Sequence, residues 1–317
     1  MPDSNLQKII NRRLIISLVI LAGMVVGFFV ITRQPGQTLV DPDLFRVADQ
    51  EKVDKVWLQS VQKNVELKYD GAHWHVNEKY EADAQLINVL FATLDQARPK
   101  RSVSSNLQDS IGAKLMREGV EVTLFIGNDL VKKFRAGGNE KKTESWFMED
   151  GDKPYVMTIP GYRAYVSYVL ELGEEAWRDK RIFNFNWRNF KSLNASVKSD
   201  PGQDFEVTFV DKFFTIPGLA KVDTTRLNDY LDAVSLLSAN QIITAHLSPA
   251  YDSLLKTEQA FQIKVKDIAD HNYQLQVWPP LKNDTNILAR WNAEDVVLFD
   301  RAQISAIARK KSYFSGH

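Results

Sequence analysis

The pattern of apolar and polar residues divides the chain into one uncharged run and a long alternating region. Residues Leu14–Thr32 carry no charged side chain over 19 positions. At 1.5 Å of rise per residue, a helix of this length spans about 28 Å, close to the hydrocarbon core of a bilayer. A buried core helix normally keeps a polar stripe, whereas this run has only Ser17 and Thr32. The pattern therefore predicts a transmembrane helix at 14–32.

Basic residues beside this run predict its orientation. Lys8, Arg12 and Arg13 precede it, and Arg33 follows it. The positive-inside rule then places the tail 1–13 in the cytoplasm and the bulk of the chain across the membrane, which in a bacterium is the periplasm. No small-x-small cleavage site closes the run, so we expect an uncleaved, single-pass anchor in the inner (cytoplasmic) membrane.

Two glycines give this helix a narrow face. Gly23 and Gly27 form a small-xxx-small pair, which lets two helix backbones approach closely. Glycine is also common in membrane helices without any such role. The pair is our candidate for helix packing in the membrane, against another subunit or a second copy of the chain.

Beyond a linker at 33–50, the sequence repeats itself at a spacing of 140 residues. The alternating segment 65–69 matches 205–209, and 74–76 matches 214–216. Asp83 and Asp223 each precede apolar positions at helical spacing, where an N-cap residue is expected. The match continues with a small drift through the second half of each unit.

The alternating segments have the period of half-buried strands, so each unit reads as strands, a helix, more strands and a closing helix. The closing helices are expected at 162–172 and 301–311. The predicted fold class is α+β, with two tandem units built on mainly antiparallel sheets and helices on one face. We place the first unit at 51–176, the join at 177–192 and the second unit at 193–317.

Four features in order also resemble a known family: the N-terminal anchor, a strand pair ending in Trp74-His75-Val76, a helix opened by Ala82-Asp83, and an Arg-Asp-Lys-Arg-Ile-Phe segment at 178–183. Together they resemble an uncharacterised bacterial family of membrane-anchored proteins. Its genes commonly lie beside gliding-motility-type ABC exporters and their auxiliary subunits. The resemblance implies an accessory envelope component and no known catalytic residue.

Composition excludes several classes of protein. The 40 basic and 40 acidic side chains give no net charge, which argues against a nucleic-acid partner. The absence of cysteine excludes disulfides, thiolate metal sites, thiol nucleophiles and a lipid-modified cysteine. Two acceptor sequons, at Asn194 and Asn283, leave a eukaryotic secretory origin open.

Candidate chemistry is sparse. His73 and His75 would share one face of a strand, but a metal needs further ligands that are not visible nearby, so both are expected on a solvated surface. Gly137-Gly138-Asn139 lacks the features of a phosphate loop and is expected in a hairpin turn. No nucleophile motif is present. We assign no catalytic, cofactor-binding or metal residue and expect no cofactor, although an enzyme with unrecognised spacing stays open.

Aromatic residues give the remaining candidates. Five tryptophans lie in strand-like segments, where they form either a sheet core or a groove for a carbohydrate or peptide. The aromatic run near the join is a candidate interaction surface, with closure of the hydrophobic core between the two units as the other interpretation. This run consists of Phe183, Phe185, Trp187 and Phe190.

These observations favour a non-enzymatic, membrane-anchored extracytoplasmic accessory subunit of an ABC-type export or gliding-motility-type envelope complex. Its expected partners are the membrane permease or auxiliary subunits, and the bilayer through the anchor; a homo-oligomer is open. The alternative is a periplasmic receptor for glycans or peptidoglycan, with tryptophans lining a groove between the units.

Overall fold

The computed structural model describes residues 21–24, 40–186, 188–210, 213–244, 247–282 and 284–316. Residues 21–24 are helical and exposed; the rest of the predicted membrane helix 14–32, with Gly27, lies outside the described residues. No helix within the described ranges combines the length and the apolar character needed to cross a bilayer. The anchor stays a prediction.

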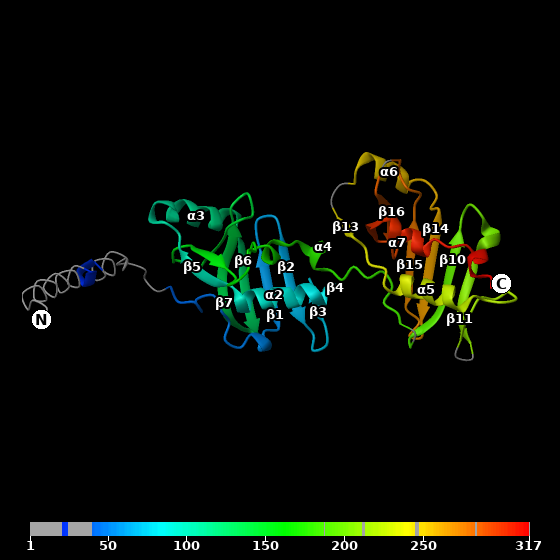
Figure 1. Ribbon diagram of the computed structural model, residues 1–317, viewed down its shortest axis with the longest axis horizontal. Coiled ribbons are helices and arrows are strands. Elements are labelled where there is room, and N and C mark those ends of the chain that lie inside the picture. Colours follow the sequence, from blue (N-terminus) through cyan, green and yellow to red (C-terminus); the bar gives the residue numbers. More distant parts are fainter. Residues whose placement is uncertain are drawn as a thin grey trace, which may run out of the picture.

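Nine strands of the first repeat form one sheet in the described chain, in the order β4-β3-β2-β1-β6-β7-β8-β9-β5. Figure 1 shows the first repeat in blue to green and the second in green to red. Its strands are β1 (Lys55–Gln59), β2 (Asn64–Tyr69), β3 (Trp74–Val76), β4 (Tyr80–Glu81), β5 (Arg98–Ser102), β6 (Val120–Ile126), β7 (Asp129–Gly138), β8 (Ser145–Met148) and β9 (Tyr155–Thr158). Its helices are α2 (Ala84–Gln96), α3 (Ser105–Glu118) and α4 (Glu174–Trp177).

The second repeat forms the same sheet, in the order β12-β11-β10-β14-β15-β16-β17-β13, and its described residues include no counterpart of β4. Its strands are β10 (Phe190–Val197), β11 (Phe205–Val210), β12 (Phe213–Thr215), β13 (Gln241–Ile243), β14 (Phe261–Asp267), β15 (Asn272–Val277), β16 (Asn286–Trp291) and β17 (Asp295–Asp300). Its helices are α5 (Thr224–Ser235), α6 (Pro249–Leu255) and α7 (Arg301–Ile307). Neighbouring strands in both sheets run antiparallel, which confirms the predicted α+β class.

The predicted N-caps open the helices that lie across the two sheets. The Asp83 carboxylate accepts from the backbone amides of Gln85 and Leu86, and the Asp223 carboxylate accepts from the amide of Arg226. Each cap satisfies amides that the first helical turn leaves unpaired. The buried face of α2 packs on the first core, and that of α5 packs on the second.

Helices cover both faces of each sheet, which corrects the prediction of one covered face. Leu115 of α3 packs with Trp146 on the side of the sheet away from α2, and α6 likewise packs over Trp278. The sequence did not reveal α3 because only Leu115 of that helix is fully buried, so its apolar stripe is weak.

The predicted closing helices are shorter than expected. In place of a helix at 162–172 the chain forms turns and one short 3₁₀ segment, Val169–Glu171, before α4. At the end of the chain, α7 stops at Ile307 and a 3₁₀ turn, Lys311–Phe314, follows. Each 3₁₀ segment places a large side chain in a core, Leu170 in the first repeat and Phe314 in the second. A short 3₁₀ turn is enough to bury one such residue, so a longer helix is not required.

The hydrogen bonds at the join show where one repeat ends. The amide of Asp83 donates to the carbonyl of Trp177 (2.8 Å), and the amide of Asp179 donates to the carbonyl of Glu81 (2.8 Å). In the second repeat, the amide of Asp223 donates to the carbonyl of Phe314 (2.9 Å), and Gly316 donates to Lys221 (3.0 Å). The first part of the predicted join is therefore the last element of the first repeat.

The second part of the join is the first element of the second repeat. The amide of Ile182 donates to the carbonyl of Leu237 (2.9 Å), and Phe183 enters the second core. Phe45, which stands 138 residues earlier, enters the first core from the end of the predicted linker 33–50. Both segments are thus built into the repeats instead of connecting them loosely.

Candidate functional site

A cavity of about 310 Å³ lies between the two repeats and receives side chains from both. Tyr80 and Glu81 enter it from the first repeat, and Tyr273 and Trp291 enter it from the second. The join contributes charged residues between them. These are Arg178, Asp179 and Arg181.

Arg178 is the buried charge of this cleft. Its side chain is 4% exposed, and its two terminal nitrogens donate to the two carboxylate oxygens of Asp295 at 3.1 and 2.5 Å. The guanidinium also lies 3.5 Å from the ring centre of Tyr80. This bidentate, stacked geometry is one that arginine makes and lysine does not. Because Tyr80 and Asp295 belong to different repeats, Arg178 ties the two repeats together.

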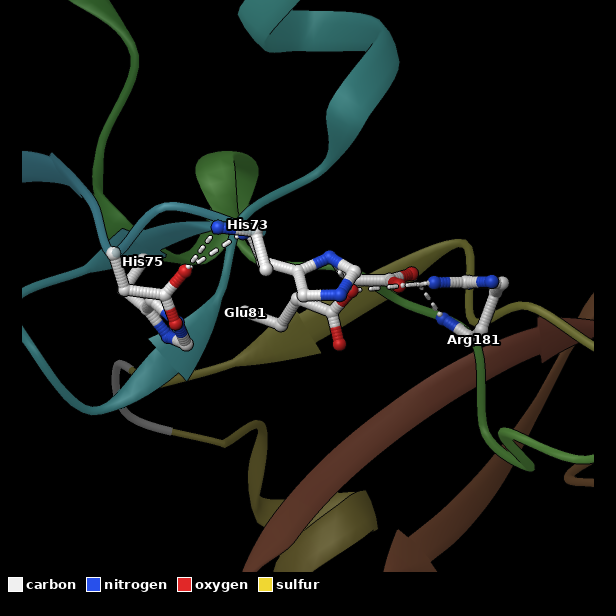
Figure 2. Close-up of polar contacts among 7 residues, drawn as sticks. His73, His75, Glu81 and Arg181 are labelled. Carbon is white, nitrogen blue, oxygen red and sulfur yellow. Dashed lines mark hydrogen bonds and ion pairs between the residues drawn. The ribbon is translucent and has the colours of Figure 1, made fainter. Parts of the chain in front are cut away.

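A second group of charges lies at the exposed edge of the cleft (Figure 2). Arg181 pairs with Asp179, whose carboxylate raises the pKa of the guanidinium, and lies 3.6 Å from the Glu81 carboxylate. The His73 imidazole approaches Glu81 from the first repeat, with Nδ1 3.5 Å from the carboxylate. This edge is a partly solvated network in which opposite charges face one another.

The two histidines serve different carboxylates. His75 Nε2 lies 2.8 Å from Asp70, whereas His73 faces Glu81 (Figure 2). Within the described residues no group of three or more metal-ligating side chains gathers. The shared metal site weighed from the sequence therefore has no such set of ligands in this part of the chain.

Asp70 makes the stability of the β2–β3 hairpin dependent on pH. The backbone amides of His73 and Ala72 and the ring of His75 hold the pKa of its carboxyl well below the ordinary value of 3.8. A carboxyl whose pKa falls on folding stabilises the folded state above its unfolded pKa, and this stabilisation is lost as the pH falls toward the folded pKa. Asp70→Asn should therefore lower the urea midpoint at neutral pH, and its difference from wild type should shrink below about pH 4. Equilibrium unfolding at neutral pH and at about pH 3 measures this; an equal difference at both would contradict it.

Two residues of the candidate aromatic interaction surface are buried, which favours the other interpretation, closure of a core. Phe183 is 1% exposed and Phe190 is 4% exposed, and both lie in the second core. Phe185 is half-buried and packs against the same core, and Trp187 lies outside the described residues. Phe183 and Phe185 come from the irregular segment before β10 and Phe190 is the first residue of β10, and they close a core within one repeat. Apart from its own helix backbone, no heavy atom of the described residues lies within 4 Å of the position that a Cβ would take on Gly23.

Sequence reasoning missed the Arg178–Asp295 pair. The Arg-Asp-Lys-Arg segment was visible as a join, but its acidic partner stands 117 residues later at the start of β17. No local pattern in the sequence marks which of many acidic residues meets a given arginine. The repeat does not predict this pair either, because Ser315 occupies the position of Arg178 in the second unit.

Comparison with known proteins gives one match. A family model described as "Domain of unknown function (DUF4340)" matches residues 74–253, from β3 of the first repeat to α6 of the second. The matched region covers more than half of the chain and includes the whole join. No curated protein and no solved structure matches.

Proposed function

Since the chain belongs to the DUF4340 family, whose description assigns no activity, we propose its function from its architecture. The protein is a membrane-anchored, extracytoplasmic accessory subunit of an ABC-type export or gliding-motility-type envelope complex. It acts by protein–protein interaction. The predicted anchor at 14–32 supports the location, and the resemblance noted above supports the kind of complex. The partner is the membrane permease or an auxiliary subunit of that complex.

The observation that carries this proposal is an exposed apolar hairpin in the second repeat. Phe209, Val210 and Phe213 are 42%, 53% and 71% exposed, and they flank the β11–β12 turn at the edge of the sheet. Phe213 lies on the edge strand β12, and Phe209 and Val210 lie on the neighbouring strand β11. Exposed apolar side chains clustered at a sheet edge are typical of a docking surface and otherwise favour aggregation.

The matching hairpin of the first repeat is polar, in contrast to the apolar hairpin of the second. Asp70 and His73 of the first repeat occupy the positions of Val210 and Phe213, at the 140-residue spacing. Both hairpins sit on the same fold, so folding alone does not require apolar residues there. The difference supports a partner contact that belongs to the second repeat.

Co-purification tests the proposal. The full chain, expressed in its host membrane and extracted in mild detergent, should recover a permease or auxiliary subunit detectable by mass spectrometry. Phe213→Ser should reduce that recovery at least ten-fold, because it removes the most exposed ring of the hairpin. His73→Ser, at the matching position of the first repeat, is the control and should recover the partner as wild type does. Recovery of the wild-type chain alone at every protein concentration would contradict the proposal.

A further inference from the structure

The largest cavity described in the first repeat has an aromatic wall. It has a volume of about 730 Å³ and lies between the 46–53 segment, the β2–β3 hairpin and the end of α2. Ligand pockets commonly fall between about 300 and 1,000 Å³. The glycan groove expected from the sequence was placed between the units, whereas this cavity lies within one of them.

Three aromatic rings form a continuous surface in the cavity. Tyr69 and Trp74 are paired across strands with ring centres 5.6 Å apart, and Phe91 of α2 lies 5.3 Å from Trp74. Tyr69 is 40% exposed and the other two rings are half-buried, so part of each ring remains accessible from the cavity. Such a surface offers a flat apolar platform with a phenolic hydroxyl at its edge.

Polar groups surround this platform. Arg46 lies 3.1 Å from Asp95 across the cavity rim, and Glu51 lines the same cavity. Gln50 donates to the carbonyl of Phe91 (2.6 Å), which leaves its buried Oε1 without a partner in the described residues. An unpaired buried acceptor costs free energy unless a ligand or water donates to it. The site thus combines oxygen atoms that accept hydrogen bonds, guanidinium groups that donate them, and aromatic ring faces.

The second repeat has lost this combination. At the 140-residue spacing Tyr69, Trp74 and Asp95 become Phe209, Phe214 and Ser235. At the 138-residue spacing that relates Phe45 and Phe183, Phe185 stands where the first repeat has Val47, and its ring centre lies 5.5 Å from that of Phe190. The duplicated fold therefore does not need the polar rim, which only the first repeat keeps.

We propose that this cavity binds a saccharide, with a pyranose ring stacked on Trp74 and Tyr69 and its hydroxyls bonded to Asp95 and Arg46. A pyranose presents an apolar C–H face to an aromatic ring and hydroxyl donors and acceptors around its edge, which matches the platform and its rim. The cavity accommodates a ligand of disaccharide size. This binding is separate from the hairpin contact of the second repeat.

Calorimetric titration of the full chain tests the site. The chain is held in a detergent without a sugar headgroup, such as lauryldimethylamine oxide, and titrated with diacetylchitobiose and with cellobiose. We expect saturable binding of at least one disaccharide, accompanied by a change in tryptophan fluorescence. Saturation by neither probe would overturn the proposal.

Matched variants locate the binding. Tyr69→Ala should weaken disaccharide binding at least ten-fold, and Asp95→Ala should do the same. Phe209→Ala is the control: it removes a ring of similar exposure at the matching position of the second repeat, and it should bind as wild type does. Equal weakening by Tyr69→Ala and Phe209→Ala would overturn the site. Phe213→Ser should also bind the disaccharide normally, so failure of this proposal and failure of partner recovery are told apart.

Discussion

Arg178→Met is expected to lower the free energy of unfolding by about 3–5 kcal/mol, the usual cost of breaking a buried ion pair from one side. The methionine fills much of the space but leaves the Asp295 carboxylate without its bidentate partner and uncovers the ring of Tyr80. Because this pair joins the repeats, we also expect the wild type to unfold in one transition and the variant in two. Urea unfolding followed by circular dichroism and by tryptophan fluorescence measures both effects.

Two further variants make this expectation specific. Arg181→Met removes a half-exposed arginine of the same cleft, whose surface pairs should contribute less than about 1 kcal/mol. The double variant Arg178→Met with Asp295→Leu should regain part of the lost stability, because no charge is then left unpaired. A single variant as stable as wild type, or a double variant less stable than the single one, would show that the pair does not join the repeats.

Local patterns were enough to predict much of the fold. Asp83 and Asp223 could be predicted as caps because an N-cap side chain bonds to backbone amides only two or three positions further along the chain. The duplication could be seen because matched strands and helices keep one spacing over most of the unit, and the two sheets share their strand order. Antiparallel pairing followed from alternation with polar outer positions.

What could not be predicted depends on distant parts of the chain. The partner of Arg178 and the cavity beside Trp74 are assembled from segments that no sequence spacing connects. The start of each repeat was also not predicted: Phe45 falls in the predicted linker and Phe183 in the predicted join, although each enters the core at the beginning of its unit. An isolated aromatic residue near Pro or charged residues gives no periodicity from which burial can be inferred.

Both repeats also end on a large buried side chain. Trp177 and Phe314 are each fully buried, and each carbonyl accepts from the amide of the aspartate that caps the main helix of its repeat. The closing residue therefore fills the core and at the same time holds the start of α2 or α5. A residue with both roles is expected to matter more than its place at the end of a repeat suggests.

Trp177→Ala should accordingly destabilise the first repeat by about 3–5 kcal/mol, and Phe314→Ala should destabilise the second by a similar amount. Each variant leaves a cavity under its own helix, in a core cluster that does not include the other residue. Hydrogen–deuterium exchange should then quicken mainly in α2 for the first variant and mainly in α5 for the second.

Tyr168→Ala, which removes an exposed ring close to Trp177 in sequence, is the control and should leave both helices protected. Trp177→Phe should cost less than Trp177→Ala, since it keeps most of the buried area and removes an indole N–H that has no partner among the described residues. Equal acceleration of α2 and α5 by either alanine variant would contradict two repeats with separate cores, each closed by its own final aromatic residue.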